Sequence, residues 1–374
     1  MKIQLCVFYW DYDEWRGLGL DGWGFEDVLP FFKKSEDFVS VTGEKNFHGV
    51  GGELKVSRER FTDPIVKIFL EAGEELGYPV GDTNGDFEDS GFTIAQTTTH
   101  QGFRAGAFEA FAEQFVGGNL TVMTHAHVTR VLVEEGRAVG VEVDRFGDRL
   151  RLEASREVVL SAGTVGTPQI LMLSGIGDRQ HLKEVSHLST LHFKVGVEPL
   201  VDLPEVGRNL QDHLMSGLSA SVLPGLSMDP LAMFYPSTWT AIAGGEGPLT
   251  HTGCDGIAFV RTERQDIGDP RPDIQFHMIA ASLATDRGML LKDLIGFKAD
   301  DPVDPWWQPH VGKDTFTLAP TLLRWSVGRS LPHLCSGQSR EVRSDCALPT
   351  RLQPHLSKPT TSQTSKTLTR WWPA

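Results

Sequence analysis

The sequence is poor in cysteine and in long apolar runs, and each deficit excludes a class of protein. It has four cysteines in 374 residues, and no two of them form a Cys-x-x-Cys pair. This pattern argues against both a disulfide framework and a zinc ribbon. No apolar run approaches the roughly 20 residues that cross a bilayer, so no transmembrane segment is expected. Neither observation assigns a compartment.

Positive charge is also scarce. Lys and Arg number 35 against 49 Asp and Glu, which gives a formal net charge of -14 at pH 7. Nucleic acids and anionic lipids select clustered Lys and Arg, so neither is an expected partner. Hydrophobic residues make up 40% of the chain and charged residues 22%. That balance is typical of a globular protein, here long enough for two or three domains.

Local patterns predict a mixture of helices and strands. Apolar residues at helical spacing predict helices at residues 25–34 and 64–76. Alternating apolar and polar residues predict an antiparallel meander over residues 119–143. The meander leads into a short apolar, β-branched strand at residues 158–160, so this strand is expected to join a sheet that is already formed.

The most informative segment is Val158–Gly177. It runs from an apolar strand to a glycine turn, an apolar helix and a Ser-Gly-Ile-Gly stop, the order of a nucleotide-binding unit. Small residues at Ala162 and Gly163 let a phosphate or ribose approach the backbone, and the helix that starts near Thr164 directs its dipole at the same site. The residues alone fit a purely structural strand-turn-helix unit equally well.

The same segment resembles the second signature of the glucose-methanol-choline family of FAD-dependent alcohol oxidoreductases. The matching positions are Gly163, Thr164, Thr167, Pro168, Ile170, Leu171, Ser174, Gly175, Ile176 and Gly177. Further segments that resemble the family are Asp11–Trp15, His48–Gly52, Asp82–Gly85, Asn119–Val131 and Gly207–His213. Together the matches extend over about residues 11–324.

The resemblance implies an α/β fold with α+β elements. It comprises an incomplete FAD/NAD(P)-binding Rossmann-like domain and a second, substrate domain built on an antiparallel sheet. Residues 11–50 and 119–215 are expected in the FAD-binding domain, and residues 51–118 and 216–324 in the substrate domain. Residues 325–374 hold seven Lys or Arg against two Asp or Glu, with fourteen Ser or Thr. This last segment is expected to be a disordered tail outside the family.

The function implied by the resemblance is FAD-dependent oxidation of the CH-OH group of an alcohol, with hydride transfer to the flavin. The enzyme would be similar to choline dehydrogenases or glucose dehydrogenases. The backbone of one valine meets the FAD adenine in relatives, and other contacts surround the phosphates and the flavin. These cofactor contacts are expected at Val128, Ala162, Gly163, Thr164, Asp212 and His213. For His213, a structural hydrogen bond with Asp212 is an equally open reading.

Two parts of the family pattern are not found. The strand-GxGxxG-helix unit that binds the FAD pyrophosphate would have to precede Asp11. The catalytic histidine belongs to a C-terminal block that residues 325–374 do not resemble. No catalytic residue is therefore assigned, and FAD binding is expected to be impaired. The alternative function is a catalytically dead, truncated or faulty gene product that acts at most as a binding module.

Two further patterns resemble functional motifs but are interpreted as ordinary structural features. Gly17–Gly22 matches G-x-G-x-x-G, but acidic residues and no strand precede it, which indicates a surface turn. The alternative is an unrelated NAD-type enzyme that uses these glycines. His125 and His127 are expected on one face of a strand at a spacing compatible with metal ligation. No third ligand is evident nearby in the sequence, so no metal site is predicted.

Overall fold

The computed structural model describes residues 3–4, 9–39, 47–58, 61–82, 84, 90–187, 197–229, 232–265, 268–285 and 308–323. They belong to two compact units, called unit 1 and unit 2 below. Unit 1 draws on Met1–Leu120 and His213–Val327, and unit 2 draws its described residues from Thr121–Asp212. The predicted tail at residues 325–374 lies outside the described residues. No helix in the described part of the chain has the length and apolar character needed to cross a membrane.

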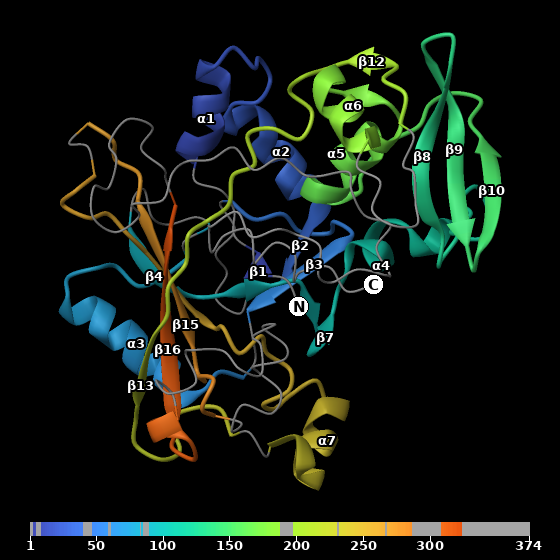
Figure 1. Cartoon of the computed structure of the whole chain (residues 1–374). Coiled ribbons are helices and arrows are strands. Elements are labelled where there is room, and N and C mark those ends of the chain that lie inside the picture. The colour runs from blue at the N-terminus through green and yellow to red at the C-terminus, as the bar shows by residue number, and fades with distance from the viewer. Residues whose placement is uncertain are drawn as a thin grey trace. The chain divides into compact units, whose positions relative to one another are not determined.

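Unit 1 is built on a five-stranded antiparallel sheet (Figure 1). In spatial order its strands are β13 (Leu218–Ser221), β16 (Thr315–Leu322), β15 (Ile274–Ile279), β14 (Gly256–Val260) and β4 (Gly91–Ile94). β4 comes from far earlier in the chain than its neighbour β14. This sheet confirms the prediction of an antiparallel sheet.

Helix α3 (Pro64–Glu75) packs against β4 and β14 of this sheet. Pro64 occupies the first turn, where its fixed φ and missing N–H cost nothing. A Cβ on Gly73 would lie 2.6 Å from the ring of Phe92, so glycine at this position permits the close approach of helix and sheet. Ile65 and Val66 join the buried core, and each such side chain contributes about 1.5–3 kcal/mol of burial energy.

A second, four-stranded sheet in unit 1 has the order β1 (Ile3–Gln4), β5 (Gln96–Thr97), β3 (Leu54–Arg58) and β2 (Glu36–Val39). Only the β2–β3 pair in it is parallel. The short elements of unit 1 are α4 (Ala107–Phe111), α7 (Pro236–Ala243), the β6 (Thr99–His100)–β7 (Phe103–Arg104) pair and the 3-10 turns Glu113–Phe115, Ala232–Phe234 and Gln308–His310.

The glycine pattern Gly17–Gly22 lies in the turn between α1 (Tyr9–Gly17) and α2 (Phe25–Ser35). Gly19 and Gly22 have φ values of +90° and +81°, which suit a turn. A helix precedes the glycines where a dinucleotide motif needs a strand. The interpretation as a turn is therefore confirmed.

Unit 2 begins with a three-stranded antiparallel meander in the order β10 (Asp148–Glu153), β9 (Arg137–Arg145), β8 (His127–Glu134). Two-residue turns join the strands, and both residues of each turn have positive φ, at Glu135–Gly136 and Phe146–Gly147. Such turns match the right-handed twist of a hairpin. The meander prediction, made for residues 119–143, is confirmed for residues 127–143.

The remainder of unit 2 comprises α5 (Gly163–Leu173), α6 (Arg179–His187) and a short parallel pair formed by β11 (Ile176–Gly177) and β12 (Val201–Asp202). Its buried core is formed by Met172, Leu182 and Val185. α5 contacts β8, so this helix and the meander belong to one packed body (Figure 1).

Two strand predictions are wrong. Residues 158–160 form no strand, and Val159 is 75% exposed. A strand exists only where a neighbour completes its hydrogen bonds, and no described segment pairs with these residues. Residues 121–126 are also irregular, and His125 has a φ of 55° and stacks on Phe146. His125 and His127 therefore do not share a strand face.

Candidate functional site

The predicted phosphate-approach segment lies at the exposed start of α5. Gly163 has a φ of +82°, and no atom lies within 4 Å of a Cβ built on it. The Ala162 N–H donates a 3.0 Å hydrogen bond to Oγ1 of Thr167, and this bond stabilises the turn at the start of the helix. Ala162, Gly163 and Thr164 are all exposed. The first N–H groups of this helix therefore face open space with the positive end of its dipole.

Val128 lies on β8, where it pairs with Val143 of β9. Ser174, at the end of α5, connects this strand to the helix. Its Oγ donates to the Ile170 carbonyl at 2.6 Å and accepts from the Val131 N–H at 2.8 Å. The two predicted adenine-side and phosphate-side segments are thus held in one unit, in which α5 packs on β8.

The remaining two predicted cofactor contacts, Asp212 and His213, lie at the sequence boundary between unit 2 and unit 1. Asp212 is the last described residue of unit 2, and His213 begins the second segment of unit 1. Nδ1 of His213 donates to the Leu322 carbonyl at 2.9 Å. Asp212 and His213 are both exposed. Burial, together with the nearby His213, lowers the pKa of His277, which lies in β15. A role of Asp212 and His213 at the flavin stays a prediction.

Two buried histidines, each between two carboxylates, were not among the predicted site residues. The first is His48, whose Nδ1 lies 3.0 Å from Oε1 of Glu36 and whose Nε2 lies 2.8 Å from Oδ2 of Asp82. Its ring stacks on Phe38 at 3.8 Å between centroids. Burial by itself lowers the pKa of His48, but the hydrogen bonds and charges of Asp82 and Glu36 outweigh it and raise the pKa to about 9. His48 is therefore a buried imidazolium at neutral pH.

Asp82 also accepts two further hydrogen bonds. The Asn84 N–H donates to Oδ1 at 2.8 Å, and Nε2 of Gln96 donates to Oδ2 at 2.9 Å. Burial raises the pKa of Asp82, but the bond to His48 and these donors lower it overall. This ion cluster connects β2 and β5 with the segment that precedes β4.

The stability of unit 1 is expected to fall as pH rises through about 9. The pKa of His48 is raised by folding, so its contribution is complete below the unfolded value of about 6.5 and is lost as the folded group deprotonates. The measurement is the free energy of unfolding in urea between pH 7 and 10. The His48→Gln variant, which cannot titrate there, is the control. An equal pH slope in both proteins would contradict the assignment.

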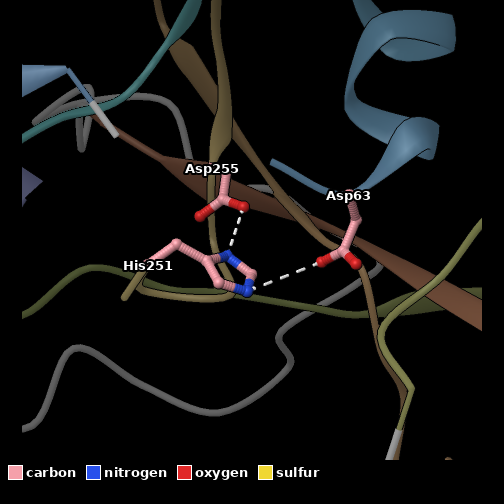
Figure 2. A group of neighbouring side chains, drawn as sticks. All are labelled: Asp63, His251 and Asp255. Carbon is pink, nitrogen blue, oxygen red and sulfur yellow. Dashed lines mark hydrogen bonds and ion pairs between the residues drawn. The ribbon is translucent and has the colours of Figure 1, made fainter. Parts of the chain in front are cut away.

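The second buried histidine is His251, in the turn before β14 (Figure 2). Its Nδ1 lies 2.6 Å from Oδ2 of Asp255, and its Nε2 lies 3.8 Å from Oδ2 of Asp63. The side chain of His251 is 1% exposed, that of Asp255 is 0% exposed and that of Asp63 is 6% exposed. Burial raises the pKa of Asp63 to about 6, against the opposing charge of His251. Burial lowers the pKa of His251, but Asp255, Asp63 and the Pro248 carbonyl raise it overall.

The sequence held only partial signals of these two sites. His48 and Asp82 both lie in segments that resemble the family, yet nothing in the residues indicated that they meet. His251 and Asp255 stand four residues apart, a spacing that permits a local pair. Asp63 precedes them by more than half of the chain's described length, so only the packing of α3 near β14 brings it to His251.

Comparisons with known proteins agree with the fold and the signature. The profile of the GMC oxidoreductase family matches residues 9–215, more than half of the chain. An oxygen-dependent choline dehydrogenase from Rhizobium etli is 33% identical over 284 residues, covering 74% of this chain and 48% of that protein. A glucose dehydrogenase (FAD, quinone) from Drosophila pseudoobscura pseudoobscura is 40% identical over 209 residues, covering 54% and 32%.

A solved structure of a formate oxidase from Aspergillus oryzae matches with a TM-score of 0.69 at 22% identity, covering 86% of this chain and 57% of that chain. This likeness concerns the fold alone. The chain spans about half the length of the first of these curated relatives. On the profile match and the signature in α5, the chain belongs to the GMC oxidoreductase family.

Proposed function

We propose that this chain binds FAD and takes part in the oxidation of the CH-OH group of a small alcohol. The observation that carries the proposal is the signature Gly163–Gly177, whose helix begins at an exposed glycine in a chain of the GMC oxidoreductase family. Choline and glucose, the compounds in the names of two relatives, both carry hydroxyl groups. An alcohol is therefore the proposed substrate class.

The residues at the start of α5 fit a phosphate or ribose of the cofactor. The space around Gly163 is open, and the helix directs unpaired N–H groups and a partial positive charge into it. Val128 lies on the neighbouring β8, where its backbone is proposed to contact the adenine. Asp212 and His213 are proposed to lie near the flavin. Bound FAD would supply the hydride acceptor, while these residues hold and orient it.

Flavin content is the direct test. The full chain is purified without added cofactor and its visible absorbance measured, then it is incubated anaerobically with choline or glucose. Yellow protein that an alcohol bleaches supports the whole proposal, and yellow protein that neither alcohol bleaches supports FAD binding alone. Weak colour that added FAD restores indicates impaired binding. Colourless protein that binds no added FAD contradicts the proposal and favours the alternative of an inactive gene product.

The Gly163→Ala variant is expected to bind FAD about tenfold more weakly, because its methyl group enters the space proposed for the cofactor. The measurement is titration of the apoprotein with FAD, followed by flavin fluorescence. Gly19→Ala is the matched control, since Gly19 also has positive φ and open space around its Cβ. Equal weakening in both variants would remove Gly163 from the proposed site.

A further inference from the structure

The two buried histidines of unit 1 differ in how their ring nitrogens are satisfied. Both nitrogens of His48 lie within 3.0 Å of a carboxylate oxygen. In the second cluster, Nε2 of His251 and Oδ2 of Asp63 are buried, and neither atom has a hydrogen-bond partner among the described residues. A buried polar atom without a hydrogen-bond partner destabilises the folded protein. These two atoms lie 3.8 Å apart, and a cation that accepts an electron pair from each of them would satisfy both.

The contact with Asp255 determines which ring nitrogen carries hydrogen. Nδ1 of His251 lies 2.6 Å from Oδ2 of Asp255 and 3.2 Å from the Gly253 nitrogen. The shorter, charge-assisted contact is the stronger one, so Nδ1 donates to Asp255. In the neutral ring, Nε2 then presents its lone pair to Asp63. The Pro248 carbonyl, as a backbone hydrogen-bond acceptor, favours the protonated ring and raises the pKa of His251, so an ion at Nε2 would have to displace that proton.

The separation of 3.8 Å between Nε2 and Oδ2 is too long for a hydrogen bond. Zinc binds imidazole nitrogen and carboxylate oxygen at about 2.0–2.2 Å, so one ion fits between these two atoms. A divalent ion would also neutralise the two buried carboxylates beside a neutral imidazole. The ligand atoms offered by the three residues all lie within 4.8 Å of one another.

We propose that the cluster of Asp63, His251 and Asp255 is a binding site for one zinc-like divalent cation. Nε2 of His251 and the carboxylate of Asp63 are the ligands, and Asp255 orients the imidazole from Nδ1. A carboxylate behind a ligating histidine is a recurrent arrangement at metal sites. Water or the second oxygen of Asp63 completes the coordination.

The proposed role of the metal is to join two elements of unit 1. The three side chains are at most 6% exposed, so an ion between them would be enclosed by the protein. Asp63 stands at the N-terminus of α3, whereas His251 and Asp255 belong to the turn that leads into β14. A shared ion would tie the helix to the sheet on which it packs. Metal binding is therefore expected to raise the melting temperature of the chain.

The test uses the untagged full chain, treated with EDTA, desalted and then loaded with Zn²⁺. After gel filtration, one zinc per chain and a higher melting temperature are expected. Absence of both would overturn the proposal. Co²⁺ replaces Zn²⁺ in a parallel experiment on the unmodified protein and on His251→Gln, and the position and intensity of its visible d–d bands report the ligand set. Identical Co²⁺ spectra in the two proteins would also overturn the proposal.

Variants locate the site. Asp63→Asn and His251→Gln are expected to lose the zinc, whereas Asp255→Asn weakens binding about 10- to 100-fold, as changes behind a ligand do. Glu71→Gln is the control, because it replaces an exposed carboxylate of the same helix α3 by an amide at little cost in stability. Asp63→Ser, which keeps a good helix N-cap, replaces Asp63→Asn if circular dichroism shows that the latter is unfolded. Stoichiometric zinc in a folded Asp63 variant would overturn the proposal.

Discussion

The Asp82→Asn variant is expected to lower the free energy of unfolding by about 3–5 kcal/mol, the usual cost of breaking a buried ion pair. Oδ1 and Oδ2 of Asp82 accept hydrogen bonds from His48, Asn84 and Gln96. An amide at this position keeps one accepting oxygen and turns an NH₂ group toward a donor. The variant also leaves the buried charge of His48 with Glu36 as its remaining carboxylate contact.

Urea unfolding at pH 7 measures this effect. Glu71→Gln is the control, because the Lys67–Glu71 pair of α3 is exposed and separated by 3.5 Å. Removing such a surface pair is expected to cost less than about 1 kcal/mol. Similar losses in the two variants would show that the His48 cluster contributes no more than a surface pair.

The Gly175→Ala variant is expected to destabilise unit 2 by about 2–5 kcal/mol through two additive causes. Gly175 ends α5 with a φ of +81°, a conformation that strains any residue with a Cβ. The added methyl group would also lie 2.4 Å from the Glu198 carbonyl oxygen and 3.0 Å from Leu200. A backbone atom cannot move away cheaply, so the segment that carries β12 has to shift.

Gly163→Ala, at the other end of the same helix, separates these two causes. Gly163 has nearly the same φ, but its surroundings are empty. In this variant the free energy of unfolding is expected to fall by only about 1–2 kcal/mol, the strain of placing a residue with a Cβ at positive φ. Thermal unfolding of both proteins gives the comparison. If Gly175→Ala lowers the stability no more than Gly163→Ala does, the segment around Glu198 can move to make room for the methyl group at little cost.

The helices and hairpins were predictable because their signals are local. Apolar spacing predicted helices at residues 25–34 and 64–76, and the structure has them at Phe25–Ser35 and Pro64–Glu75. Apolar and polar alternation predicted the β8–β9 hairpin, and its Glu135–Gly136 turn has the positive φ values that such a turn requires. These features depend on neighbours a few residues apart.

The strand expected at residues 158–160 failed for the opposite reason. Its Val-Val-Leu composition favours a strand, but composition supplies no hydrogen-bond partner. Among the described residues no segment pairs with it, and Val159 stays 75% exposed. The same limit applies to residues 119–126, where apolar alternation does not produce a ladder.

The sequence by itself determined the family, the helix that starts at Gly163 and the turn that ends it at Gly175, because glycine, proline and apolar spacing act over a few residues. Only the tertiary structure decided which charged groups meet inside unit 1. Asp63 and His251, like Glu36 and Asp82, come from separate segments, and their contacts exist because helix and sheet packing buries them together. These contacts matter because the groups are buried. A carboxylate is well solvated in water, whereas a buried, ionised one is stable only beside an opposite charge or hydrogen-bond donors.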